Sequence, residues 1–343
     1  MTAPQNILIV RTDRIGDVVL SLPMAKIIKK RYPNCKITFM LREYTKPLAV
    51  TNSFIDEILL LKEKNGKTTI WENVSLVKAK KLDTCFVVYP TFEIALFLFL
   101  SRIKKRIGTG YRWYSLLFNK RIYEHRKHGR FHELEHNVKM LKMIGIDENV
   151  SPENVSFNIQ SCAESRQKVD EISNEYNINF LLPTVIIHPG SGGSSVDLPL
   201  LLFKKIVELL ARELNINILI TGSKSEYGMC NQLVINSKII NLAGRFDLSG
   251  MIALIEKSKL MIANSTGPIH IAAALGKYVI GFYPKIMECS QKRWGPFTNK
   301  KKIFEPTIDC SNCDPKQCER LNCMSSININ EVYEEVQKLL ALN

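Results

Sequence analysis

The alternation of short β-branched apolar runs with stretches of helical periodicity most constrains the fold, and it occurs twice along the 343-residue chain. A strand, a helix and a further strand at this spacing form a parallel sheet with crossover helices. The predicted strands are 6–11, 36–41, 57–62, 84–89, 184–188, 216–221, 238–242, 260–264 and 278–283. The helical patterns lie near 18–32, 199–213, 224–236, 248–258 and 267–276.

A polar, strand-poor stretch at about 150–182 separates the two runs. The sequence therefore predicts two doubly wound α/β domains that face a central cleft and bind ligands at the carboxyl ends of their strands. We expect residues 1–165 to form the first domain and 166–328 the second. An apolar stripe in the last segment, 329–343, predicts a helix that packs on a domain.

The charge of the chain is strongly and unevenly basic, with 47 Lys and Arg against 33 Asp and Glu. Residues 102–130 contain ten Lys or Arg and one acid, so this segment carries +9. Such a cluster favours an anionic partner, namely nucleic acid, an anionic membrane face or a phosphorylated substrate, although a solvated face is the plain alternative. The longest apolar run, 94–100, is too short to span a bilayer, which takes about 18 residues. Without a signal-like N-terminus, we expect a cytoplasmic protein.

The stretch RTDRIGDVVLSLP, residues 11–23, follows the first strand. It matches neither the dinucleotide-binding pattern of three glycines nor the P-loop pattern. Gly16 marks the turn from strand to helix, and Asp17 lies at or just inside the helix start. An aspartate at that position caps helices well, so the residues alone leave capping and catalysis both open for Asp17.

Two later stretches favour anion binding. VIIHPGSGGSSVDLP, 185–199, places a glycine- and serine-rich turn after a strand, where backbone N–H groups form anion nests. MIANSTGPIHIAAALGK, 261–277, leads a buried strand into a helix N-terminus, which binds phosphate readily. A surface loop in the first case, and capping by Ser265 or Thr266 with a packed His270 in the second, are the structural alternatives. In ILITGSKSEYG, 218–228, Lys224 or Glu226 could reach a ribose or a phosphate.

Taken together, the Gly-Asp pair, the His-Pro-Gly-x-Gly stretch, NLAGRFDL and STGPIHIAAALG resemble glycosyltransferase family 9, and the resemblance covers nearly the whole chain. It extends to RIGTGYRWYSLLFNKRI and HELEHNVKMLKMIGI. The family comprises heptosyltransferases that build the inner core of bacterial lipopolysaccharide from ADP-heptose. The resemblance implies a GT-B fold with an N-terminal acceptor domain and a C-terminal nucleotide-sugar domain. It also implies transfer with inversion and without metal, and no D-x-D pair occurs in the sequence.

The resemblance also implies roles for individual residues. Asp17 corresponds to the family's proposed general base. The expected acceptor contacts are Arg14, Gly16, Arg112, Lys120 and Arg121. The expected contacts to the donor nucleotide-sugar are Ser191, Gly192, Gly193, Lys224, Glu226, Phe246, Ser265, Thr266, Gly267 and His270. No cofactor is expected.

The expected partners are an ADP-sugar donor, the Kdo or first heptose of nascent lipopolysaccharide, and the inner membrane face, with no nucleic acid. Val196 and Ser265 stand where many relatives carry a cation and an aspartate, so the donor sugar is less constrained than the fold. A transferase for another nucleotide-sugar and a nucleotide-sugar epimerase are the alternatives of the same fold. A nucleic-acid-binding protein is the alternative of another class, with bases stacked on Tyr111, Trp113, Tyr114 and Phe118.

Four cysteines crowd together near the C-terminus, at positions Cys310, Cys313, Cys318 and Cys323. Their spacing could bind zinc, but strong zinc patterns usually contain two C-x2-C pairs and this stretch contains one. Zinc, a disulfide and reduced packing in a cytoplasmic loop all stay open, and the last is favoured.

Overall fold

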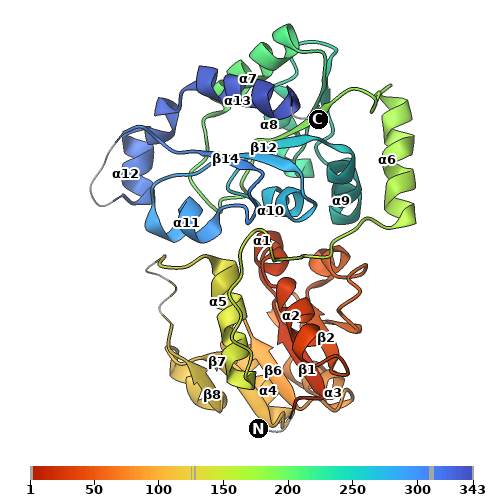
Figure 1. Cartoon of the computed structure of the whole chain (residues 1–343), viewed down its shortest axis with the longest axis vertical. Helices are drawn as coiled ribbons and strands as arrows, with labels where there is room; N and C mark the ends of the chain where they lie inside the picture. Colours follow the sequence, from red (N-terminus) through yellow and green to blue (C-terminus); the bar gives the residue numbers. More distant parts are fainter. Residues whose placement is uncertain (1–2, 125, 127–128, 309–312, 342–343) are drawn as a thin grey trace. The chain divides into compact units, whose positions relative to one another are not determined.

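The computed structural model describes residues 3–124, 126, 129–308 and 313–341, which form two compact units (Figure 1). Unit 1 contains the described residues up to 126 together with 133–159, and unit 2 contains 129–132 and 160–341. The main part of unit 2 begins at residue 160. The short segment 129–132, earlier in the chain, also belongs to that unit. No helix in the described ranges is long and apolar enough to cross a membrane.

Unit 1 is built on a six-stranded parallel sheet with the order β3-β2-β1-β6-β7-β8. Its strands are β1 (Asn6–Val10), β2 (Lys36–Leu41), β3 (Glu57–Leu60), β6 (Thr84–Val87), β7 (Lys105–Thr109) and β8 (Lys120–Ile122), with a separate hairpin of β4 (Glu63–Lys64) and β5 (Lys67–Thr68). Its α-helices are α1 (Ile15–Val19), α2 (Pro23–Arg31), α3 (Ile70–Lys78), α4 (Phe92–Leu100) and α5 (Glu133–Lys139). The 3-10 helices are η1 (Glu43–Leu48), η2 (Trp113–Leu117) and η4 (Met140–Ile144).

Unit 2 repeats this plan with a six-stranded parallel sheet in the order β11-β10-β9-β12-β13-β14. Its strands are β9 (Thr184–His188), β10 (Asn217–Ile220), β11 (Ile239–Asn241), β12 (Leu260–Asn264), β13 (Tyr278–Phe282) and β14 (Lys301–Phe304). Its α-helices are α6 (Ala163–Glu175), α7 (Leu200–Glu213), α8 (Tyr227–Asn231), α9 (Leu248–Lys257), α10 (Gly267–Ala274), α11 (Gln291–Trp294), α12 (Pro315–Arg320) and α13 (Ile329–Ala341). The 3-10 helices are η5 (Lys224–Glu226), η6 (Met287–Cys289) and η7 (Cys323–Ser326).

Both sheets have the doubly wound strand order, in which the first strand lies between the second and the fourth main strand. The winding direction reverses beside β1 in unit 1 and beside β9 in unit 2. In open parallel sheets this reversal opens a crevice at the carboxyl ends of the strands, and ligands bind there. The loops after β1, β6, β9 and β12 are therefore the positions that the fold favours for chemistry.

The structure divides the predicted helix 18–32 into α1 and α2, because Pro23 has no backbone N–H and takes the first position of a new helix. The apolar run 94–100 lies in α4, where Ile94, Phe97 and Leu98 are buried in the core of unit 1 and Phe99 is exposed. The last helix, α13, packs on α7 in unit 2 through Val332, Val336 and Leu339, among other contacts.

Phe203 on α7 gives a test of how unit 2 is held together. Its ring is fully buried and meets Phe282 of β13 edge-to-face, with 5.5 Å between the ring centroids. We expect Phe203→Ala to lower the free energy of unfolding by about 3–5 kcal/mol, the cost of removing a buried aromatic ring. Leu201→Ala on the same helix is the control, because Leu201 is 64% exposed, and we expect a change within about 0.5 kcal/mol. Urea denaturation measures both, and equal losses would contradict the assignment.

Candidate active site

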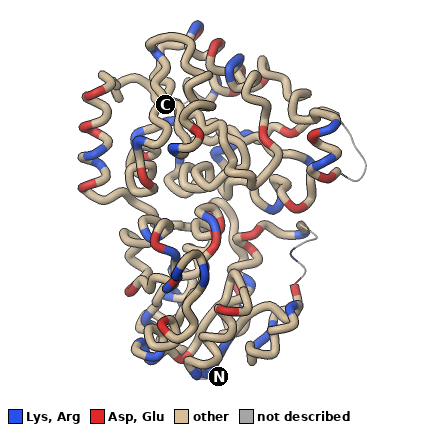
Figure 2. The backbone as a smooth tube through the Cα atoms, turned by 180° about the vertical axis from the view of Figure 1, so that it is seen from behind, with Lys and Arg blue, Asp and Glu red and all other residues tan. Residues whose placement is uncertain are grey.

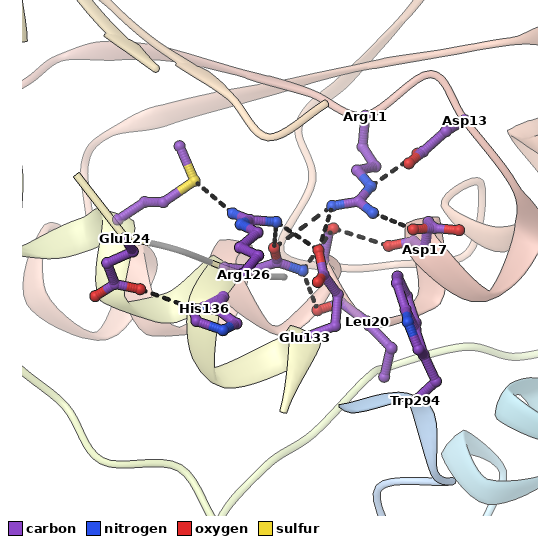
Figure 3. Close-up of polar contacts among 12 residues, drawn as sticks. Arg11, Asp13, Asp17, Leu20, Glu124, Arg126, Glu133, His136 and Trp294 are labelled. Carbon is purple, nitrogen blue, oxygen red and sulfur yellow. Dashed lines mark hydrogen bonds and ion pairs between the residues drawn. The ribbon is translucent and has the colours of Figure 1, made fainter. Parts of the chain in front are cut away.

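A buried arginine organises the carboxyl end of β1. Arg11 follows the strand directly and is 2% exposed. Its guanidinium group contacts three carboxylates: Nε lies 2.7 Å from Asp13 Oδ1, Nη1 lies 3.3 Å from Glu133 Oε1, and Nη2 pairs with Asp17 Oδ1. Figure 3 shows the guanidinium between Asp13 and Asp17 on one side and Glu133 of α5 on the other. One cation thus contacts carboxylates from the segment that follows β1 and from α5.

A second arginine completes this network. Arg126 pairs with the same carboxylate of Glu133, and its Nη1 lies 3.2 Å from Asn137 Oδ1 (Figure 3). The amide nitrogen of Asn137 donates to the carbonyl oxygen of Leu20 and to Ser21 Oγ, each at 3.1 Å. Helix α5 is therefore hydrogen-bonded to the turn that follows α1. Helix α1 is the one that carries Asp17.

The network holds two guanidinium groups and three carboxyl groups, so it is anionic when every carboxyl group is ionised. Although burial opposes its charge, the carboxylates of Asp13, Asp17 and Glu133 raise the pKa of Arg11 above its ordinary value. Burial, opposed by Arg11 and reinforced by Asp17, raises the pKa of Asp13 to about 7. Asp13 is accordingly the group that retains a proton near neutral pH.

Asp17 is the third residue of α1, as the sequence suggests, but it does not cap the helix in the described structure. The N-cap is Arg14, and α1 has no side-chain cap hydrogen bond among the described residues. The carboxylate pairs instead with Arg11 through Oδ1, while Oδ2 accepts no hydrogen bond from the described residues. This geometry fixes the orientation of the carboxylate and leaves one oxygen available for a proton.

The other predicted acceptor contacts lie in two parts of unit 1. Arg14, the N-cap of α1, is exposed, and Gly16, next to Asp17 in α1, is buried. Arg112 is exposed and precedes η2, and Lys120 is exposed at the start of β8. Arg121 has a structural contact, because its Nε donates to the carbonyl oxygens of Ser115 and Phe118 at 3.0 and 3.2 Å.

In unit 2 the glycine-rich loop after β9 is tied to β12 by hydrogen bonds. Asn264 is fully buried; its Oδ1 accepts the N–H of Leu198 at 2.9 Å and its amide donates to the carbonyl oxygen of Pro189. Ser194 Oγ donates to the carbonyl oxygens of Ser191 and Ser265, both at 2.8 Å. Within the loop, Gly192 and Gly193 have positive φ values of 59° and 74°, which glycine adopts without steric cost. The predicted residues 191–193 therefore lie beside the start of α10.

The start of α10 brings together Ser265, Thr266, Gly267 and His270. Thr266 is the N-cap, in extended conformation, and Ser265 is buried. His270 is 5% exposed, and its Nδ1 has no hydrogen-bond partner among the described residues. Burial, with smaller effects from His132 and Lys301, lowers the pKa of His270 to about 3. His270 is therefore neutral at pH 7 and can supply a hydrogen bond but no charge.

Glu226 faces the same loop from η5. Its Oε2 accepts the N–H and Oγ–H of Ser223, both at 2.7 Å, and these bonds lower the pKa of Glu226 even though burial opposes them. A methyl group on Gly190 would lie 1.9 Å from Glu226 Oε1, so the carboxylate packs directly against the glycine-rich loop. Burial lowers the pKa of the neighbouring His188 to about 4, so its imidazole is also neutral at pH 7.

The remaining predicted donor contacts are less closely placed. Lys224 is exposed at the start of η5, with its backbone against Gly244. Phe246 is half-buried and packs against Gly250 at the start of α9. Val196 is partly buried against the apolar core of unit 2, so it provides no charge to the loop.

The C-terminal cysteines lie in an apolar environment as far as the structure describes them. Cys318 and Cys323 are buried with Ile286, and Cys313 packs against this cluster. Cys310 lies outside the described residues. In the described ranges, no group of three or more His, Cys, Asp or Glu is placed to hold a metal ion. The four-cysteine arrangement stays a prediction.

Comparisons with known proteins agree with this architecture. The chain is 25% identical to a putative glycosyltransferase of Haemophilus influenzae, over 97% of this chain and 96% of that protein. It is 23% identical to a lipopolysaccharide core heptosyltransferase of the same species, over 98% and 97% of the two chains.

Solved structures are also similar. A family 9 glycosyltransferase of Veillonella parvula has a TM-score of 0.84 at 18% identity, over 99% of this chain and 98% of that one. The ADP-heptose lipopolysaccharide heptosyltransferase II of Escherichia coli has a TM-score of 0.78 at 20% identity, over 98% and 99%. The fold is thus that of the GT-B glycosyltransferases, as predicted.

The family model of glycosyltransferase family 9 (heptosyltransferase) matches residues 73–324. The chain belongs to this family, and it is an enzyme of the heptosyltransferase type.

The raised pKa of Asp13 predicts a particular pH dependence of stability. The folded protein holds a proton on Asp13 between about pH 4 and pH 7, where the unfolded chain has released it. The extra proton bound by the folded protein stabilises it at low pH, and this stabilisation is lost as the pH rises through that window. We expect the stability of Asp13→Asn relative to the wild type to increase as the pH rises from about 4 to about 7, because Asn is neutral at every pH.

Urea denaturation at several pH values measures this difference. Asp147→Asn is the control, because the Asp147 side chain is 70% exposed beside Lys142. A stability difference between Asp13→Asn and the wild type that is constant with pH would contradict the protonation of Asp13.

Proposed function

We propose that the protein transfers heptose from ADP-heptose to the Kdo or heptose inner core of lipopolysaccharide, with inversion and without a metal ion. The observation that carries the proposal is the Asp17 carboxylate, which Arg11 holds by Oδ1 while Oδ2 accepts no hydrogen bond from the described residues. Membership of the heptosyltransferase family and the similarity to a lipopolysaccharide core heptosyltransferase support the donor and the acceptor.

Asp17 acts as the general base in this proposal. Its Oδ2 takes the proton of the acceptor hydroxyl while that oxygen attacks the anomeric carbon from the face opposite ADP. The new C–O bond forms as the bond to the diphosphate breaks, and ADP departs with the electron pair. A single attack from the opposite face inverts the anomeric configuration.

ADP is stabilised by neutral groups of unit 2. The N-terminus of α10 and the backbone N–H groups of the glycine-rich loop favour negative charge on the diphosphate. His270 offers a buried Nδ1 with no partner among the described residues, which suits a hydrogen bond to the donor. These groups fit a transfer in which no metal ion neutralises the leaving diphosphate, consistent with a sequence that has no D-x-D pair.

The acceptor is embedded in lipid, so we place the enzyme at the cytoplasmic face of the inner membrane, bound peripherally. Arg14, Arg112 and Lys120 are exposed on unit 1 and supply cations for acceptor phosphates or carboxylates. Of the four aromatic residues on which the nucleic-acid alternative depends, Tyr114 and Phe118 are buried, whereas Tyr111 and Trp113 are exposed.

Incubation with ADP-heptose and defined Kdo-lipid acceptors, read by mass spectrometry, tests the proposal. We expect an acceptor mass increased by one heptose and release of ADP. Other nucleotide-sugars, such as UDP-N-acetylglucosamine, test the alternative of a different donor. Transfer from one of these and not from ADP-heptose would overturn the donor assignment.

Asp17→Asn tests the general base. We expect kcat to fall by roughly 10²–10⁴, the contribution of a positioned acid or base, with little change in ADP affinity. Asp56→Asn is the control, because Asp56 pairs with Lys29 and accepts the N–H of Ile37 at 2.6 Å, away from the Arg11 network. Turnover near the wild-type rate in Asp17→Asn would remove Asp17 from the chemistry.

Gly190→Ala tests the role of Glu226 in donor binding. The new methyl group would displace the Glu226 carboxylate from the glycine-rich loop. We expect ADP affinity to fall about two- to tenfold, the value of roughly one hydrogen bond. Gly228→Ala on α8 is the control, because a methyl group there meets no atom within 4 Å. Titration calorimetry measures both, and equal ADP affinities would place the nucleotide away from Glu226.

A further inference from the structure

An exposed apolar surface lies on unit 1, outside the Arg11 network. Trp113 is 73% exposed and Leu116 is 66% exposed, and both belong to η2. Residues three apart in a 3-10 helix lie on the same face, so the two side chains project together. The ring of Phe92 stacks on that of Trp113 with 4.8 Å between centroids, and Phe92 is itself 36% exposed. We call Phe92, Trp113 and Leu116 the apolar patch.

The patch rests on a well-packed base. On the inner side of η2, Tyr114 is buried and its hydroxyl donates to the carbonyl oxygen of Pro90 at 2.8 Å. Phe118 is also buried, in the same core as the inner face of α4. The inner side of η2 therefore packs into the core of unit 1, while Trp113 and Leu116 remain exposed.

Basic side chains lie in the same segment of the chain as Trp113 and Leu116. Arg112 precedes Trp113 directly and Lys120 begins β8, and neither forms an ion pair among the described residues. Basic residues occur on both units, as Figure 2 shows, but the segment 102–130 has ten of them against one acid. Glu93 is exposed next to Phe92, but the segment that carries Trp113 and Leu116 has an excess of cations. Such an aromatic and aliphatic surface is complementary to an anionic lipid interface, where Trp rings lie at headgroup depth.

We propose that the apolar patch inserts into the interface of an anionic bilayer, with Arg112 and Lys120 contacting lipid phosphates. This inference rests on the proposed function, because a lipid-linked acceptor requires an enzyme at the membrane. A bilayer fits the patch better than a nucleic acid does. Leu116 has no π-face on which a base can stack, whereas it contributes favourably in an apolar interface.

The topology of unit 1 connects this surface to the base. Asp17 follows β1, Phe92 follows β6 and Trp113 follows β7, and these three strands are parallel neighbours in the sheet. The carboxyl ends of parallel strands lie along one edge, with neighbouring strands about 4.8 Å apart. The patch and Asp17 therefore share an edge of the same sheet. A bilayer bound at the patch would present its lipid-linked sugars toward the edge that carries Asp17.

Vesicle binding tests the patch directly. In flotation assays with full-length protein, we expect binding to phosphatidylethanolamine–phosphatidylglycerol vesicles, weak binding to phosphatidylcholine vesicles, and a loss of binding as salt increases. The double variant Trp113→Ala with Leu116→Ser should weaken binding to the anionic vesicles about tenfold or more. Trp71→Ala is the matched control, because Trp71 is also 73% exposed on unit 1 but lies on α3.

Fluorescence gives a second readout. The chain has three tryptophans, so Trp71→Phe with Trp294→Phe leaves Trp113 as the only one. We expect its emission to shift to shorter wavelength with anionic vesicles and to be quenched by brominated lipid. An unshifted emission, or equal losses of vesicle binding in the patch variant and in Trp71→Ala, would overturn the proposal. Binding of single-stranded RNA that depends on Trp113, without binding to vesicles, would assign the patch to nucleic acid instead.

Activity separates this inference from the proposed function. The patch variant should transfer sugar to a delipidated, soluble acceptor at the wild-type rate and lose activity only on acceptor embedded in vesicles. An equal loss on both acceptors would place the patch in the sugar site and overturn membrane docking. Vesicle binding that depends on Trp113, in a protein that transfers no heptose, would retain the patch and reject the proposed function.

Discussion

The active-site half of unit 1 depends on the burial of one positive charge. Arg11 lies at the end of the central strand β1, where its guanidinium is removed from water. A buried charge is stable only when it is paired. Removing one partner destabilises the fold strongly, because it leaves the other charge buried without compensation. The Arg11 guanidinium therefore dictates that carboxylates from α1, from the loop before it and from α5 converge on one point. The position of Asp17 follows from this requirement.

Unit 2 has the same fold as unit 1, but the corresponding loops are joined by neutral hydrogen-bonding groups instead of ion pairs. Its loops after β9 and β12 are joined by hydrogen bonds through Asn264 and Ser194, which are neutral. Both nearby histidines, His188 and His270, have lowered pKa values because burial disfavours their charged forms. Apart from the Glu226 carboxylate, the side chains named here around the helix N-terminus are neutral hydrogen-bonding groups, which suits an anionic leaving group that must also be released. In the mechanism that we propose, the network of unit 1 removes the proton and the groups of unit 2 stabilise the leaving group.

The sequence predicts the central strands well, because strands buried on both faces are continuous apolar runs, as β1 and β12 are. It does not predict β7, β8 and β14, whose sequences KRIGT, KRI and KKIF are basic. Strands β8 and β14 lie at sheet edges, where Lys and Arg discourage pairing with another chain, so hydrophobicity does not reveal them.

The site is predicted only where its residues are close in sequence. Asp17, Gly16 and Arg14 form one motif, and so do the residues that begin α10. Arg11 is predicted only as the end of a strand, because its partner Glu133 lies 122 residues away. A buried Arg at a strand end next to two aspartates is the signal that could have identified it, since an arginine there needs several acceptors. Glu133 and Asn137 have no such local signal.

The basic segment illustrates why charge alone assigns function poorly. Several of its cations stabilise the fold: Arg106 Nε donates to the carbonyl oxygen of Leu117 at 2.9 Å, Arg121 contacts the carbonyls of η2, and Arg126 pairs with Glu133. The remaining cations include Arg112 and Lys120, which are exposed in the same segment of the chain as Trp113 and Leu116. The net charge of the segment is compatible with any anionic partner. The exposed cations, together with the exposed apolar side chains, suit a partner surface that is both charged and apolar. A lipid interface has that combination, and it also explains why the aromatic residues remain on the surface beside the strand ends.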